Sequence, residues 1–87
     1  MIKEYTVYIL INDSGRRYIG LSEDPTVRLD QHNNGDSKWT AKHRPWSLEW
    51  ESAAMSLSKA RKLENKMKRQ KGGEGLLILM HEYESGS

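Results

Sequence analysis

Two tyrosines near the start of the chain are the first side chains that could do chemistry. Tyr8 and Tyr18 stand in two runs of β-branched and aromatic residues, separated by a break that ends at Gly15. If the runs pair as a hairpin with a three-residue loop, both phenols fall on one face as diagonal neighbours, close enough to share a site. Strand tyrosines are also ordinary packing residues, so the pair alone leaves a shared site and simple packing both open.

A basic pair follows the tyrosines. Arg28 and His32 are four residues apart, so on a helix they project from one face, about one turn from each other. A pair of this kind on a helix surface is usually solvated. It gains chemical meaning only if its face looks toward the two tyrosines.

One carboxylate stands inside a basic segment. Glu64 is the only acidic residue between positions 57 and 70, and it follows Leu57 by nearly two helical turns. A surface ion pair with Lys68 or Arg61 would explain it. A place at the edge of the core is the other interpretation, and there a carboxylate is costly to desolvate without a counter-charge or a metal ion.

The elements that must position these side chains begin with the hairpin. Residues 4–11 and 16–21 are predicted strands, and Gly15 suits a positive-φ position in the loop between them. The face opposite the tyrosines is apolar. It consists of Val7, Ile9, Ile11, Ile19 and Leu21.

A helix is predicted over residues 25–33, where it would carry the basic pair. Ser22 or Asp24 serves as its cap, and Pro25 suits its first position. The polar segment 36–43 is expected to form a helical turn or an irregular loop.

The second half of the chain begins with a predicted strand over residues 46–52. Its alternation places Trp46, Leu48 and Trp50 together on a buried face. Trp39, just upstream, is either a core anchor or a residue that stacks on nucleic-acid bases, and the core position is favoured.

Two helices are predicted to complete the fold. The first runs from Ser56 to about Gln70, and Gly72 and Gly73 end it. Its buried stripe comprises Leu57, Ala60, Leu63 and Met67. The second covers residues 75–83, where a continuous apolar run favours a packed helix and leaves a strand as the alternative. Residues 85–87 are expected to form a flexible tail.

Composition limits the class of protein. The 87 residues suit a single small domain over positions 1–87, and the absence of Cys excludes disulfide frameworks and cysteine-rich metal sites. No apolar run is long enough to span a membrane, and no signal peptide precedes the first strand. The sequence therefore predicts a cytoplasmic protein without a membrane partner.

Charge is distributed unevenly behind a net value of +2. Residues 38–71 carry ten basic and three acidic side chains, whereas the segments on either side are both acidic. A basic block of this kind is a candidate surface for a polyanion, although basic helices are often only solvated. The predicted nucleic-acid contacts are Lys38, Lys42, Arg44, Lys62 and Lys66.

Taken together, the five candidate residues resemble the GIY-YIG nuclease family. Tyr18-Ile19-Gly20 is the second signature literally, and Thr6-Val7-Tyr8 keeps only the tyrosine of the first. The segments around Arg28 and His32 and from Ala60 to Glu64 follow in the family order. The resemblance covers nearly the whole chain, and it is closest to the small stand-alone members related to the nuclease module of an excision-repair enzyme.

The resemblance implies an α+β fold and a metal-dependent activity. The expected fold is a three-stranded antiparallel sheet flanked by helices, in the order β-β-α-β-α-α. The expected reaction is hydrolysis of phosphodiester bonds in DNA with one Mg²⁺ or Mn²⁺ ion. Glu64 would ligate the metal, Arg28 would hold the phosphate, and one tyrosine, with Tyr8 favoured, would act on the attacking water, supported by Tyr18 and His32.

Departures from the family pattern leave the substrate open. The first triplet lacks its glycine, and no counterpart of a late polar residue follows Gly72. Branched, damaged and non-specific DNA all remain as substrates, as does delivery of the substrate by a protein partner. The alternative function is a nucleic-acid-binding module with the same fold and negligible turnover, and RNA is a lesser alternative as substrate.

Overall fold

The chain folds into a three-stranded antiparallel sheet with helices on both faces, in a computed structural model that describes residues 3–70 and 73–84. The predicted α+β architecture and its order of elements are confirmed, with a short helix, α2 (Lys38–Lys42), at the place where a helical turn or loop was expected. The tail predicted over 85–87 and the stop signal at Gly72 lie outside the described residues.

The hairpin at the start of the chain forms as its sequence predicts. Strands β1 (Thr6–Asn12) and β2 (Arg17–Ser22) pair antiparallel, and β1 is the central strand of the sheet. The amide of Asn12 donates to the carbonyl oxygen of Arg16 at 3.1 Å, which closes a three-residue loop. Gly15 takes φ +84° in this loop, a conformation that glycine adopts without strain.

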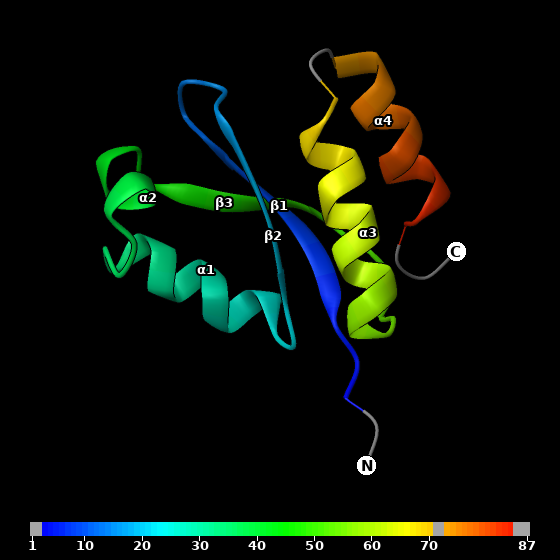
Figure 1. Cartoon of the computed structure of the whole chain (residues 1–87). Coiled ribbons are helices and arrows are strands. Elements are labelled where there is room, and N and C mark those ends of the chain that lie inside the picture. Colours follow the sequence, from blue (N-terminus) through cyan, green and yellow to red (C-terminus); the bar gives the residue numbers. More distant parts are fainter. Residues whose placement is uncertain (1–2, 71–72, 85–87) are drawn as a thin grey trace.

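The two faces of β1 contribute to two separate cores, and Figure 1 shows helices on both sides of this strand. On one face, Val7 and Ile9 pack against α3 (Leu57–Lys68) and α4 (Gly73–Glu82). On the other face, Tyr8 and Leu10 pack with Trp46 and with the helical layer that contains α1 (Pro25–Asn33). The alternation of the hairpin therefore separates an aliphatic core from an aromatic one.

Strand β3 (Trp46–Glu51) departs from the predicted alternation. Ile9 pairs with Trp50, but Leu10 pairs with Leu48, so Glu49 is an extra residue in the ladder. A bulge of this kind reverses the side on which the following residues point. Trp46 consequently lies in the aromatic core and Trp50 packs against the aliphatic one, and the prediction that they share a face is wrong.

Helix α1 has the predicted bounds and cap. The side chain of Asp24 accepts from the amides of Thr26 and Val27, while Pro25 occupies the first turn. Helix α2 (Lys38–Lys42) follows after a turn at Gly35 and leads into β3. Both helices lie over the aromatic side of the sheet (Figure 1). The side chain of His32 on α1 contacts Tyr8, and that of Thr40 on α2 contacts His32.

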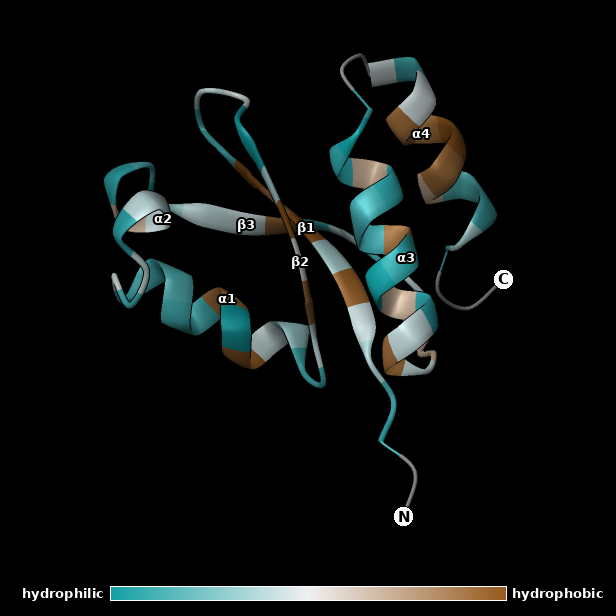
Figure 2. Cartoon of the chain, in the orientation of Figure 1, coloured by the Kyte–Doolittle hydropathy of each residue, from teal (hydrophilic) through white to brown (hydrophobic). Residues whose placement is uncertain are grey.

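Helices α3 and α4 cover the aliphatic side. Ser56 caps α3 as predicted, and Ala60, Leu63 and Met67 are buried. Leu57 is 38% exposed, so its predicted place in the buried stripe is wrong: it is the first residue of α3, and the buried positions of this helix begin at Ala60. The apolar run of α4 is helical, with Leu76 and Leu79 buried (Figure 2).

Among the described residues, no helix combines the length and the apolar character that crossing a membrane requires.

Candidate active site

The two signature tyrosines lie side by side on the aromatic face of the hairpin. Tyr8 pairs with Gly20, and Tyr18 pairs with Leu10, so the tyrosines are the predicted diagonal neighbours. Their ring centroids are 6.3 Å apart. Tyr8 is only 1% exposed, whereas Tyr18 is half-buried and so presents part of its ring to solvent.

Gly20 makes this arrangement possible. A Cβ atom built on Gly20 would lie 2.6 Å from the hydroxyl oxygen of Tyr8 and 3.1 Å from the ring of Tyr18. A side chain at this position would therefore displace one ring or the other. The glycine of the Tyr18-Ile19-Gly20 triplet serves the packing of the tyrosines rather than a special backbone angle, since its φ is not positive.

His32 joins Tyr8 to a buried threonine. Its Nε2 atom lies 3.1 Å from the Tyr8 hydroxyl, and its Nδ1 atom lies 2.9 Å from the hydroxyl of Thr40 on α2. Thr40 in turn donates to the carbonyl oxygen of Ser37, at 3.4 Å. Because its single proton is used there, Thr40 accepts from Nδ1–H, and the lone pair of Nε2 faces the tyrosine hydroxyl.

The side chains of Tyr8 and His32 are both held in their neutral forms. Burial lowers the pKa of His32, the charge of Arg28 lowers it further, and Asp36 works in the opposite direction. Burial raises the pKa of Tyr8; the guanidinium of Arg28 opposes this increase, while Tyr18 and Glu64 add to it. At neutral pH the pair is therefore a phenol that donates to a neutral imidazole.

Arg28 is the fixed positive charge beside the tyrosines. It is half-buried on α1, one turn before His32, and its guanidinium donates to the side-chain oxygen of Gln31. Interaction with the hydroxyl of Tyr8, opposed by burial and supported by Tyr18, holds the pKa of Arg28 above its ordinary value. Arg28 and His32 thus face the two tyrosines. This is the condition under which the pair was expected to have a chemical role.

Glu64 lies at the edge of the same cluster. Its carboxylate accepts from Lys68 at 3.1 Å, and its side chain is only 16% exposed. The ion pair with Lys68 and the place at the edge of the core, which the sequence offered as alternatives, are therefore both present. Glu64 is a largely buried carboxylate, and Lys68 supplies its counter-charge. Its negative charge contributes to the raised pKa of Tyr8, after burial and Tyr18, which places it within electrostatic reach of the phenol.

Trp39 forms the exposed rim of the cluster. Its ring centroid is 6.3 Å from that of Tyr18 and 4.8 Å from that of His43. With 45% of its surface exposed, Trp39 is not a core anchor, so the favoured prediction is wrong. Its neighbour Thr40 takes the buried position on this short helix instead.

Sequence reasoning missed two contributors to this site. Thr40 sets the tautomer of His32, and Gly20 admits the rings of the tyrosines. The literal signature around Gly20 was a usable signal, because a glycine inside a strand marks close packing. Nothing in the local sequence distinguishes Thr40 from the other polar residues of segment 36–43.

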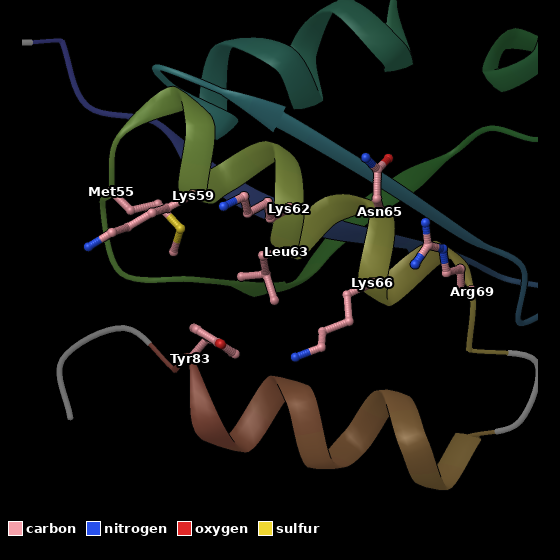
Figure 3. A pocket seen from close by; sticks show the side chains of 8 residues that line it. All are labelled: Met55, Lys59, Lys62, Leu63, Asn65, Lys66, Arg69 and Tyr83. Atoms are coloured by element: carbon pink, nitrogen blue, oxygen red, sulfur yellow. The ribbon is translucent and has the colours of Figure 1, made fainter.

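The predicted nucleic-acid contacts divide between two places. Lys38, Lys42 and Arg44 lie on or just after α2, near the aromatic rim. Lys62 and Lys66 instead line a groove that also contains Tyr83 (Figure 3). Residues two positions apart on a helix point about 200° apart, so both lysines lie on the flank of α3 opposite Glu64.

Comparisons with known proteins agree with this geometry. The chain matches the GIY-YIG catalytic domain over residues 4–76, a range that contains every candidate catalytic residue.

The chain is also 34% identical over 65 residues to a protein of Aeromonas hydrophila subsp. hydrophila described as a UPF0213 protein. This match covers 74% of the chain but only 48% of that relative, so the chain spans about half the length of the relative. No solved structure matches it. With the family signature over most of its length and the tyrosine, arginine, histidine and glutamate side chains in one cluster, the chain belongs to the GIY-YIG catalytic domain family, a family of nucleases.

Proposed function

We propose that this protein is a divalent-metal-dependent DNA endonuclease. The observation that carries the proposal is the hydrogen-bonded chain from Tyr8 through His32 to Thr40, with Arg28 beside it. A simple packing role for the tyrosines needs neither an oriented imidazole nor a fixed cation. The resemblance to an excision-repair module supports DNA repair or recombination in the cytoplasm as its setting.

The chain of hydrogen bonds supplies a route for one proton. Tyr8 passes its hydroxyl proton to Nε2 of His32 as it accepts a proton from the attacking water. The hydroxide so formed attacks the phosphorus, the bond to the leaving oxygen breaks, and that oxygen takes a proton from solvent to become a hydroxyl group. Nδ1–H stays with His32 throughout, since Thr40 accepts from it, and the imidazole carries the added charge.

Arg28 stabilises the phosphate during this reaction. Its planar guanidinium can donate two hydrogen bonds to non-bridging oxygens while the negative charge on them grows. Because Arg28 already lies against the tyrosines, it would bring the phosphorus next to Tyr8 and Tyr18. The exposed part of Tyr18 supports a role in holding the substrate in that position.

Glu64 fits a hard divalent cation. Within residues 3–70 and 73–84, no three His, Cys, Asp or Glu side chains form a cluster that could hold a metal ion unaided. Mg²⁺ commonly uses one or two carboxylates, substrate phosphate oxygens and water, so a single largely buried carboxylate suits it or Mn²⁺. When bound, the metal would polarise the scissile phosphate and stabilise the leaving oxygen. Lys68 would have to release the carboxylate of Glu64.

Specific observations favour the alternative, a nucleic-acid-binding module with little turnover. Tyr8 is 1% exposed, its pKa is raised chiefly by burial, and Glu64 is already paired with Lys68. Each of these opposes catalysis by an unliganded site. In this alternative the cluster is a structural core with a DNA-binding rim.

A cleavage assay distinguishes the two functions. Supercoiled plasmid and branched oligonucleotides are incubated with the protein in Mg²⁺, in Mn²⁺ and in EDTA. The endonuclease nicks DNA only with metal, and Tyr8→Phe removes that activity while Tyr5→Phe, in the aliphatic core, keeps it. Binding without nicking under every metal condition would establish the alternative.

A further inference from the structure

A basic groove lies on the other flank of α3, away from the candidate active site. It has a volume of about 680 Å³ and runs along α3 toward the end of α4. Figure 3 shows Tyr83, at the end of α4, across from Leu63 and Lys66, which come from α3. The lining residues are Met55, Lys59, Lys62, Leu63, Asn65, Lys66, Arg69 and Tyr83.

The cations of this groove have no acidic partner within the part of the chain that the structure describes. Lys59, Lys62, Lys66 and Arg69 line it together with no Asp or Glu, and none of them forms an ion pair with a described carboxylate. By contrast, Lys68 on the opposite flank is paired with Glu64. Four unpaired like charges on one side of a helix repel one another, and a bound polyanion would relieve that repulsion.

The spacing of these cations suits a strand of nucleic acid. They recur every three or four residues, so they form one row along the helix. From Lys59 to Arg69 the row extends roughly 15 Å at 1.5 Å per residue. That length corresponds to a few nucleotides, each of which brings one phosphate charge.

The apolar part of the groove favours a single strand over a duplex. The half-buried Met55 lines it together with the buried Leu63, and Tyr83 is 37% exposed at one end, so Met55 and Tyr83 supply the accessible apolar surface. In a duplex the base faces are stacked inside and cannot reach such surfaces. A single strand offers its bases to an aromatic ring while its phosphates meet the lysines, which is the usual combination in single-strand binding sites.

We propose that this groove binds a single-stranded segment of the DNA substrate. The inference rests on the proposed function, because DNA as the substrate comes from it. Since Lys62 and Glu64 point to opposite flanks of α3, the bound strand is separate from the nucleotides at Tyr8 and Arg28. The preferred substrate is therefore DNA in which a single strand adjoins a duplex, as at a flap or fork.

The test measures binding in EDTA, so it does not depend on cleavage. A fluorescein-labelled oligo(dT) strand and a blunt duplex of equal length are titrated at several salt concentrations. The double variant Lys62→Ala/Lys66→Ala should lose about tenfold in affinity for oligo(dT), with a salt slope shallower by about 1.4 for two phosphate contacts. The matched variant Lys38→Ala/Lys42→Ala, on α2, should weaken duplex binding more than oligo(dT) binding.

Tyr83→Leu tests the aromatic contribution separately. It should weaken oligo(dT) binding several-fold without changing the salt slope, because stacking releases no counterions. Thermal midpoints within a few degrees of the parent protein confirm that the variants fold.

Three outcomes would overturn the inference. Oligo(dT) affinity could be unchanged in the groove variant, or duplex and single-strand affinities could fall equally. The third outcome is that a poly-glutamate peptide displaces oligo(dT) equally well from the parent protein and from Tyr83→Leu. The ring of Tyr83 would then add nothing to strand binding, and an acidic protein segment would be the occupant. A protein that cleaves DNA but gives one of these results retains the proposed function and loses only the groove.

Discussion

The hydroxyl oxygen of Tyr8 lies 2.6 Å from the position that a Cβ atom would occupy on Gly20. This contact explains the glycine of the second signature triplet. It also ties the position of the phenol to the backbone of the adjacent strand, and so to the hydrogen bond between Tyr8 and His32.

Gly20→Ala should therefore displace Tyr8 from His32. Overpacking at such a site typically costs about 1–3 kcal/mol of stability, and metal-dependent nicking should fall by more than that loss explains. Gly73→Ala is the matched control, because a Cβ there meets nothing within 4 Å. A fully active Gly20→Ala variant would show that the position of the ring does not matter for the reaction.

Burial of His32 predicts a pH dependence of stability. Its pKa is lowered in the folded chain, mainly by burial, so the unfolded chain binds more protons as the pH falls below about 6.5. The stabilising contribution is complete above that pH and is lost as the pH drops through the lower folded pKa. Thermal midpoints between pH 7 and pH 5 should fall less steeply in His32→Gln than in the parent protein. His81→Gln, which removes a histidine with a largely exposed side chain, is the comparison variant.

Arg28→Ala should lose most of the cleavage activity while the protein still folds. Removing a donor that stabilises charge in the transition state commonly costs about 10²–10³-fold in rate. Arg28→Lys should recover little, since a lysine lacks the planar fork. Arg16→Ala, in the exposed hairpin loop, is the control. Normal nicking by Arg28→Ala would refute the role of the guanidinium at the phosphate.

Glu64→Gln should abolish metal-dependent cleavage with little effect on folding. The lost pair with Lys68 is an i,i+4 pair, worth about 0.3–0.5 kcal/mol. DNA binding in EDTA should stay or tighten slightly, because one negative charge has gone. Glu49→Gln is a close control, since Glu49 is also largely buried and paired, with Arg17. Nicking is measured across a Mg²⁺ titration for both variants. If Glu64→Gln and Glu49→Gln showed the same metal dependence, Glu64 would not be the metal ligand.

Trp39→Ala should weaken DNA binding at the rim of the site. Its exposed ring lies beside Tyr18, and stacking of a base on an aromatic ring is worth about 1–3 kcal/mol. Trp39→Phe should retain most of the affinity, which separates stacking from a structural loss. Fluorescence of 2-aminopurine placed next to the scissile position measures the stacking directly. Equal quenching by the parent protein and Trp39→Ala would exclude it.

Local signals in the sequence were sufficient for much of the fold. The cap at Asp24 and the proline after it define α1, and the three-residue loop at Gly15 sets the register that brings Tyr8 and Tyr18 together. These features depend on short-range chemistry. The spacing of Arg28 and His32 then predicted a shared face without showing where that face would look.

The features that sequence reasoning missed depend on distant contacts. The extra residue at Glu49 arises from pairing between β1 and β3, and the alternation of residues within one strand does not predict it. Trp39 and Leu57 are both exposed, and burial of a side chain depends on which elements pack over it rather than on its own segment. The division of the lysines between two surfaces follows from the side of α3 that meets the sheet.

The bulge at Glu49 also gives each core of the molecule its own fluorophore. Trp46 is buried in the aromatic core and the half-buried Trp50 packs against the aliphatic one, although they are only four residues apart. With Trp39 replaced, the emission of the two indoles can be assigned by removing one at a time. Chemical denaturation followed in this way would reveal whether the two sides of the sheet melt in a single cooperative event or in sequence.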